Sequence, residues 1–142
     1  MEAKKIIVAG GANRIGRSIA LELAGYDTQI VIHYSKSFIA AKRLKIELEN
    51  LGSDVHLLKA DLNNFKQTQK VISYAHKKMK GVDCLVNNAS IFENDNLINF
   101  SEKSFLKHIN VNLKAPAILI QNFAKLCKGK KGNIVNIIDQ RV

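Results

Sequence analysis

The 142-residue sequence is poor in several residue types, and each shortage argues against a class of protein. It has two cysteines, one proline and only 6% aromatic residues. Cys84 and Cys127 lie far apart and match no metal or redox spacing, so we interpret both as small buried residues of a reduced, cytoplasmic protein. With so few aromatic residues and no cluster of them, a stacking platform for single-stranded nucleic acid is not expected.

Long apolar runs are missing as well. No stretch reaches the roughly 18 apolar residues of a membrane span, and the N-terminus leads into a short apolar run without a signal-peptide pattern. No linker, repeat or low-complexity segment divides the chain. Because 46% of the residues are hydrophobic, we expect one domain over residues 1–142 with a substantial core and no membrane partner.

The net charge is strongly positive, at +10. Such a balance is typical of proteins that bind polyanions, so a basic nucleic-acid-binding domain is one hypothesis, and it predicts binding that weakens steeply with salt. The lysines are scattered along the predicted helices and form no single block. A lysine-rich surface without a specific partner is therefore the simpler interpretation, and nucleic acid is not the expected partner.

Short apolar runs alternate with longer helical patterns along the chain. Five runs rich in β-branched residues are predicted strands: residues 5–9, 29–33, 55–60, 84–87 and 133–138. Helical periodicity covers four segments: residues 14–24, 38–51, 65–79 and 102–126. Ser37 and Ser101 can cap their helices, and Pro116 is expected to kink the last one.

This alternation predicts an α/β fold. Strands that alternate with helices form a doubly wound parallel sheet with helices on both faces, as in Rossmann-type folds. We expect the strand order 3-2-1-4-5, truncated after strand 5. The ligand crevice is then at the carboxyl ends of strands 1 and 4, where the strand order reverses.

A glycine-rich turn follows the first predicted strand and reads Gly-Gly-Ala-Asn-Arg-Ile-Gly over residues 10–16. Glycines at such a turn let the main chain approach a pyrophosphate, which the helix N-terminal amides then bind. The strict Gly-x-Gly-x-x-Gly spacing is absent, and a tight turn without a ligand is the alternative. The flanking strand and helix favour a dinucleotide site. Its predicted residues in the turn are Gly10, Asn13, Arg14, Ile15 and Gly16.

The end of the second predicted strand carries no carboxylate. NAD-preferring sites place an acid about 20 residues beyond the glycines to hold the ribose 2′-hydroxyl. Here the chain offers His33, Ser35, Lys36 and Ser37. A 2′-phosphate is attracted by a lysine and by hydroxyl donors, whereas an acid repels it. The sequence therefore predicts NADP(H) as the cofactor, although serines that merely cap a helix are the alternative.

In this order the motifs resemble the short-chain dehydrogenase/reductase family, and most of all its pteridine-reductase-like branch. Gly10 and Gly16 match the family's Thr-Gly-x-x-x-Gly-x-Gly, whereas Ala9 and Arg14 replace the usual Thr and Gly. Arg at that position, and the His-Tyr-x-basic-Ser pattern of residues 33–37, are similar to pteridine reductases. The resemblance implies an NADPH-dependent oxidoreductase, usually homo-oligomeric, that reduces a carbonyl or a pterin-like imine.

The resemblance also implies cofactor contacts after the third and fourth strands. Asp61 and Leu62 are similar to the family's adenine-contacting pair. Asn88, Ala89 and Ser90, preceded by another asparagine, resemble the Asn-Asn-Ala-Gly signature in its Ser variant. The plainer interpretation of the two asparagines is that they tie neighbouring strands together by hydrogen bonds.

Three further positions bear on catalysis by the same resemblance. Asn112 falls on the helical asparagine of the family's catalytic tetrad, Asp139 on the active-site residue after strand 5, and Phe92 on a substrate-stacking phenylalanine. Each has a plainer interpretation: a satisfied helix residue, a strand-end cap and a core residue, respectively. No metal site is predicted.

The family's proton donor is a Tyr followed four residues later by a Lys, normally on the helix after strand 5. Val142 comes three residues past Asp139, so we expect a fragment without its proton donor, inactive alone. Tyr74 and Lys78 have the spacing, but their helix runs towards the amino ends of the strands, away from the crevice. A non-catalytic dinucleotide-binding or partner-binding module is the alternative.

Truncation also has a packing consequence. In the family, two more strands and their helices cover strand 5 and the last helix. We therefore expect residues 134–138 to form an exposed apolar edge, which invites pairing or aggregation. The isolated chain is expected to be unstable, oligomeric or completed by another polypeptide.

Overall fold

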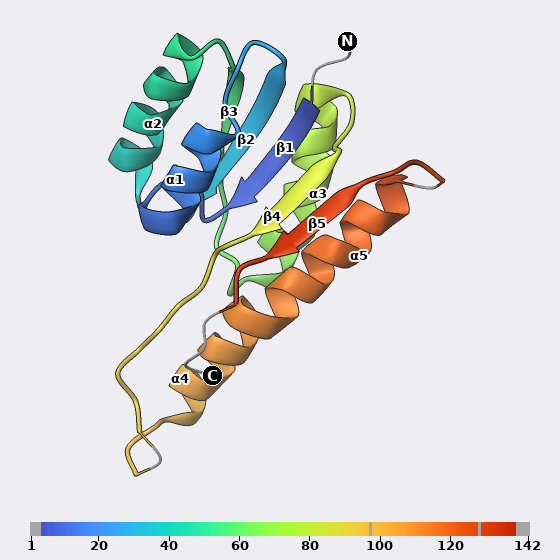
Figure 1. Ribbon diagram of the computed structural model, residues 1–142. Coiled ribbons are helices and arrows are strands. Elements are labelled where there is room, and N and C mark those ends of the chain that lie inside the picture. The colour runs from blue at the N-terminus through green and yellow to red at the C-terminus, as the bar shows by residue number, and fades with distance from the viewer. Residues whose placement is uncertain (1–3, 97, 128, 139–142) are drawn as a thin grey trace.

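The computed structural model describes residues 4–96, 98–127 and 129–138, and its strands form one parallel sheet in the order β3-β2-β1-β4-β5 (Figure 1). Each strand pairs in parallel with its neighbours. The predicted Rossmann-type topology is confirmed. The strands are β1 (Lys4–Ala9), β2 (Thr28–Tyr34), β3 (Asp54–Lys59), β4 (Cys84–Asn87) and β5 (Asn133–Asn136).

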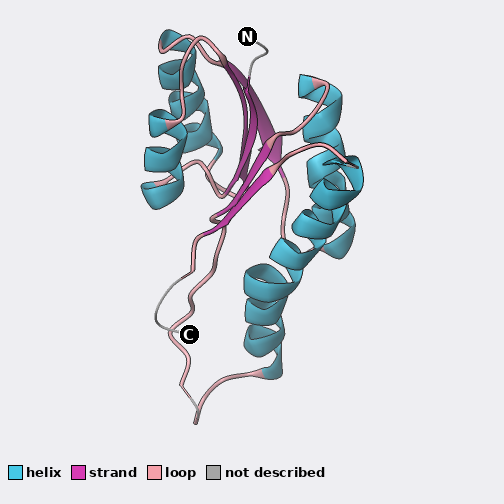
Figure 2. Ribbon diagram, turned by 45° about the vertical axis from the view of Figure 1, so that its right-hand side comes forward, coloured by secondary structure: helices cyan, strands magenta, loops and turns pink. Residues whose placement is uncertain are grey.

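Helices cover both faces of the sheet, with α1 and α2 on one side and α3 and α5 on the other (Figure 2). The helical elements are α1 (Arg14–Glu22), α2 (Phe38–Asn50), α3 (Phe65–Met79), α4 (Glu102–His108), the π-helical η1 (Ile109–Lys114) and α5 (Ala115–Cys127). Among the described residues, no helix has the length and apolar character needed to cross a membrane.

The core lies on the two faces of β1 and its neighbours. Ile6 and Val8 pack in the cluster under α1 and α2, while Ile7 belongs to the cluster under α3 and α5. All three side chains are at most 3% exposed. Burial of one such aliphatic side chain contributes about 1.5–3 kcal/mol. Because β1 is buried on both faces, its carboxyl end is held in place, and this fixes the start of the glycine turn that follows.

The expectation of one helix over residues 102–126, kinked at Pro116, is wrong in detail. The interruption is a π-helical segment that ends before Pro116. Pro116 has no N–H to donate to the carbonyl four residues earlier. The helix widens ahead of it, and the Ala115 amide bonds instead to Asn110 O, five residues back. Ser101 caps α4 as predicted, since its hydroxyl accepts a bond from the Ser104 amide at 3.1 Å.

Candidate functional site

The glycine turn packs directly against the segment that follows β4. Gly10 has φ 70°, and a Cβ there would lie 2.7 Å from Ala89 Cα. A Cβ on Gly16 would lie 2.2 Å from Gly10 O, and the Asn88 side-chain amide donates to that same oxygen at 2.9 Å. Only glycine fits at either position, so the sequence brings the main chain of the turn to the crevice.

The N-terminus of α1 faces outward from this turn. Asn13 occupies the N-cap position but makes no side-chain capping bond, so no side chain satisfies the amides of the first turn in that way. Asn13, Arg14 and Ile15 are all exposed. Arg14 adopts φ 48°, the left-handed conformation that glycine favours. These amides and the guanidinium together offer positive charge to an anion.

His33 lies behind the turn and not on its surface. It is 2% exposed; its Nδ1 accepts a bond from the Gly10 amide at 3.0 Å, and its Nε2 lies 3.0 Å from Ala60 O. Nε2 must therefore carry the proton, which makes the ring neutral. Burial lowers the pKa of His33, against opposing contributions from the Ala60 bond and Asp61. The ring joins the ends of β1, β2 and β3.

The polar residues after β2 surround the start of α2. Ser35 and Lys36 are exposed, and Ser37 is half-buried. Ser37 occupies the N-cap position, yet its hydroxyl makes no capping bond, contrary to the expectation that it caps the helix. A buried cluster of Ala12, Tyr34 and Ala41 packs the glycine turn against this corner. The hydroxyls and the ammonium group therefore lie next to the turn.

The pair after β3 has two different environments. Asp61 is exposed, and its carboxylate accepts a bond from the Asn63 amide at 2.9 Å. Leu62 is buried, at 6% exposure. Ala60, directly before them, donates to Tyr34 O at 3.0 Å, which places the pair beside the end of β2.

The asparagines after β4 do tie neighbouring segments together. The Asn87 amide donates to Asn136 Oδ1 on β5 at 2.9 Å, and Asn88 holds the glycine turn. Ala89 lies directly against Gly10, and Ser90 is exposed. This predicted group is therefore next to the turn, with Asn88 in a structural bond.

Asn112, on η1, forms two hydrogen bonds with the loop after β4. Its Oδ1 accepts from the Ile91 amide and its Nδ2 donates to Ile91 O, both at 2.9 Å. Phe92 follows directly and is 75% exposed, so it is not a core residue. Asp139, the third predicted catalytic position, lies outside the described residues.

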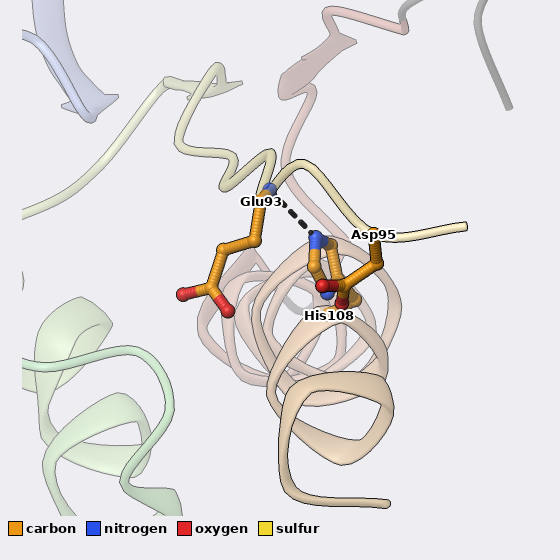
Figure 3. A group of neighbouring side chains, drawn as sticks. All are labelled: Glu93, Asp95 and His108. Atoms are coloured by element: carbon orange, nitrogen blue, oxygen red, sulfur yellow. Dashed lines mark hydrogen bonds between the residues drawn. The ribbon is translucent and has the colours of Figure 1, made fainter. Parts of the chain in front are cut away.

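Three side chains near this loop form a cluster that the sequence did not suggest. Ligand atoms of Glu93, Asp95 and His108 lie within 4.8 Å of one another (Figure 3). They already have protein partners: His108 Nε2 accepts a bond from the Glu93 amide at 3.0 Å, and the Glu93 carboxylate pairs with Lys107. The two carboxylates share the single hydroxyl donor of Ser104. The cluster therefore fastens the loop to α4. The sequence hints at these contacts only through the four-residue spacing of Ser104, His108 and Asn112, the helical residues that bond to the loop.

Tyr74, on α3, packs against β3. Its hydroxyl donates to Leu57 O on β3 at 3.1 Å, and Lys78 Nζ lies 5.8 Å from the centroid of its ring. A hydroxyl bonded to a strand carbonyl under α3 supports the sheet and faces no ligand. The Tyr74–Lys78 spacing therefore marks a packing pair.

β5 forms the edge of the sheet. In the described part of the chain it pairs only with β4. The apolar residues on β5 and directly after it are partly or largely exposed: Ile134 38%, Val135 45%, Ile137 38% and Ile138 79%. The predicted apolar edge is present.

The arrangement fits a dinucleotide. Amides at the N-terminus of α1 and a close glycine turn suit a pyrophosphate, and an exposed lysine with two serines suits a second phosphate. The exposed hydroxyl of Ser90 follows β4, which pairs directly with β1. The residues present thus match the chemistry of a nucleotide with two separate anionic groups.

Known proteins agree with this geometry. The short chain dehydrogenase family model matches residues 4–140. A 3-oxoacyl-[acyl-carrier-protein] reductase from Buchnera aphidicola is 33% identical over 136 residues, covering 94% of this chain and 54% of the relative. The FolM alternative dihydrofolate reductase 1 of Brucella canis, complexed with NADP, is 31% identical with a TM-score of 0.88, covering 96% and 54%.

A short chain dehydrogenase from Burkholderia cenocepacia, also in complex with NADP, is 28% identical with a TM-score of 0.87 and covers 95% of this chain and 55% of its own. The chain thus spans about half the length of the relatives that it matches. Its sheet order, its glycine turn and the match over residues 4–140 agree, and the chain belongs to the short-chain dehydrogenase/reductase family.

Proposed function

We propose that the chain is the NADP(H)-binding portion of an oxidoreductase that reduces a carbonyl or a pterin-like imine. When bound, NADPH supplies the hydride, and the residues of this chain bind and orient it. Gly10 and Gly16 let the main chain approach the pyrophosphate, while Asn13, Arg14 and Ile15 present the α1 amides and a guanidinium to it.

The 2′-phosphate is assigned to Ser35, Lys36 and Ser37. The observation that carries the proposal is that Lys36 and Arg14 are both exposed at the corner where the glycine turn meets α2, with no acid at the end of β2. Cationic and hydroxyl donors bind phosphate strongly, whereas a ribose 2′-hydroxyl would call for a carboxylate. Asp61 and Leu62 are assigned to the adenine.

His33 receives a different role from the other predicted residues. Its ring is buried and bonded to the main chain on both sides. We therefore assign it as a positioning residue that fixes the Gly10 amide. Asn88 has a similar role through Gly10 O, and we assign Ala89 and Ser90 to the nicotinamide end of the cofactor.

The substrate end is assigned to Phe92, Asn112 and Asp139. An exposed ring at Phe92 suits a flat conjugated substrate, and the two bonds of Asn112 to Ile91 hold the loop that carries it. The relatives that match are about twice as long as this chain. We place the proton-donating Tyr and Lys in the part of the family fold beyond these residues, so the 142-residue chain binds cofactor without turnover.

The proposal extends to the cellular compartment, the protein partner and the substrate of the chain. Cys84 and Cys127 are partly buried and not fully buried as expected, and burial raises the pKa of both thiols. Two such free thiols suit a reducing cytoplasm. The exposed β5 edge suits a second polypeptide, either another copy or one that completes the fold. The small-molecule substrate is a carbonyl or pterin-like compound.

The test compares two glycine substitutions. Gly16→Ala places a Cβ 2.2 Å from Gly10 O, whereas Gly25→Ala meets only Asp27 Oδ1, at 3.5 Å. NADPH fluorescence on mixing is expected to show binding for the parent chain and Gly25→Ala, and little for Gly16→Ala. NADPH oxidation with carbonyl or pterin substrates is expected to be absent in all three. Equal binding by Gly16→Ala would remove the glycine turn from the proposed site.

A further inference from the structure

Hydrogen bonds at three successive points connect the loop after β4 to the following helix, and we call each of these points a rung. We call residues 91–95 the strap. Ile91 pairs with Asn112 through two bonds of 2.9 Å, and the Glu93 amide donates to His108 Nε2 at 3.0 Å (Figure 3). Asp95 accepts a bond from the Ser104 hydroxyl. The strap therefore runs antiparallel to the helical segment formed by α4 and η1.

The spacing of the rungs explains why they match. Ser104 and His108 are four residues apart in α4 and so lie on one stripe of that helix, and Asn112 follows four residues later within the π-helical η1. Four α-helical residues advance about 6 Å, and two residues of extended chain advance about 6.6 Å. The second step of the strap is shortened by a turn in which the Asp95 amide donates to Glu93 O at 2.8 Å. Every second strap residue therefore meets the next turn of the helix.

The bonds at residues 91 and 93 use main-chain groups, so they fix the path of the main chain on both sides of Phe92. Asp95 is bonded through its side chain. Phe92 is 75% exposed and Asn94 is exposed as well. The direction of Phe92 is therefore set by bonds made by its neighbours and not by packing of its own ring.

His108 forms the central rung, and the hydrogen bond at Nδ1 of its ring determines that Nε2 is an acceptor. Nδ1 lies 2.9 Å from Ser104 O and donates to it, which leaves the Nε2 lone pair to accept the Glu93 amide. The Glu93 carboxylate turns to Lys107 and Ser104, whose bonds hold its pKa below the ordinary range. The main chain of the strap is thus held by His108, and its acidic side chains by neighbouring donors.

We propose that His108 is a positioning residue for the substrate end of the site, because it fixes the strap and thereby the direction of Phe92. The proposal rests on the function above only in treating Phe92 as facing the substrate. The family resemblance gave no role to residue 108, and His108 itself need not touch cofactor or substrate.

The test uses the absence of tryptophan from the sequence. Phe92→Trp introduces a single indole into the strap and serves as the background. Three double variants then combine it with His108→Ala, His108→Gln or His76→Ala. Glutamine can offer a side-chain oxygen near the position of Nε2, so it serves as the conservative variant. His76 is an exposed histidine on α3 and serves as the matched control.

With His108→Ala, we expect a lower indole anisotropy and an exchange rate of the Glu93 amide about tenfold faster, while the β1 amides stay protected. His108→Gln is expected to restore most of both, and His76→Ala to change neither. Unchanged exchange in His108→Ala, or an equal loss in His108→Gln, would overturn the proposal.

NADPH affinity is measured in parallel and is expected to be the same in every variant. Loss of NADPH binding in the His108→Ala variant alone would also count against a role confined to the strap. If no variant binds NADPH, including the parent, the proposed function fails while the exchange result still decides the role of His108.

Discussion

The imidazole of His33 accepts a hydrogen bond from the Gly10 amide at 3.0 Å, 23 residues earlier in the chain, and it is buried while doing so. A neutral ring is required at Nδ1, since a protonated ring has no acceptor left. The geometry of the glycine turn is therefore linked to the protonation of one histidine.

This link predicts a pH dependence of stability. Burial lowers the pKa of His33 from its ordinary value of 6.5, so the unfolded chain takes up a proton at a higher pH than the folded chain. The contribution is complete above the unfolded pKa and is lost as the pH falls below it towards the folded pKa, with a slope of up to about 1.4 kcal/mol per pH unit.

Urea unfolding of the parent and of His33→Asn between about pH 7.5 and pH 5.5 checks it. The variant, which cannot titrate at this position, is expected to lose less stability over the range, while starting about 1–3 kcal/mol lower because one bond to Ala60 is missing. Parallel pH profiles for the two proteins would show that His33 is not the titrating group.

A second prediction concerns backbone strain at the cofactor turn. Among the described residues, Arg14 and Lys80 are the non-glycine positions with positive φ, at 48° and 55°. Glycine at either position relieves strain of about 1 kcal/mol, so Arg14→Gly and Lys80→Gly are both expected to raise the free energy of unfolding slightly.

Only Arg14→Gly is expected to weaken NADPH binding, by about tenfold or more, because a charge-assisted bond to phosphate is lost. Thermal unfolding and NADPH titration of both variants separate the two effects. If NADPH affinity were unchanged in Arg14→Gly, the strained arginine would have no part in the cofactor site.

A third prediction concerns cofactor choice. Lys36→Glu places a carboxylate where the 2′-phosphate is assigned, so NADPH affinity is expected to fall about 10- to 100-fold while NADH affinity holds or rises. Lys42→Glu makes the same charge change at an exposed position of α2 and is the control. An equal fall for both cofactors, or in both variants, would point to general electrostatics and not to a 2′-phosphate site.

A fourth prediction concerns the sheet edge. Val135 on β5 is 45% exposed, and the chain is expected to self-associate with rising concentration in sedimentation experiments. A charge on an edge strand opposes pairing, so Val135→Lys is expected to shift the distribution towards monomer. Ile39→Lys, at a 67% exposed residue of α2, is the control and should leave association unchanged. A parent chain that is monomeric and unfolds cooperatively would contradict the prediction.

Much of the fold could be predicted because its signals are local. The β-branched runs gave all five strands, and the break in the last helix was located to within a turn because Pro116 lacks a donor. The π-helical form itself could not be predicted, since it depends on which carbonyl the Ala115 amide reaches once the tertiary fold is in place.

The site was predictable in its outline but less so in the roles of its residues. Gly10 and Gly16 are required by contacts with neighbouring main chain, which a turn motif anticipates. In the sequence, His33 is one of several polar residues at a strand end. Its burial depends on the neighbouring strands, so it could not be predicted from the local pattern. The pairing of the strap with His108 joins a loop without periodicity to a helix, so the helical spacing of residues 104, 108 and 112 alone could not predict it.

The most direct test is calorimetric titration of the unaltered 142-residue chain with NADPH and, in parallel, with NADH. The glycine turn, Arg14 and the Ser35–Ser37 corner together predict saturable binding of NADPH with a Kd about tenfold or more below that of NADH. Binding of NADH as tight as that of NADPH, or no binding of either by the folded protein, would contradict the assignment of this crevice to NADP(H).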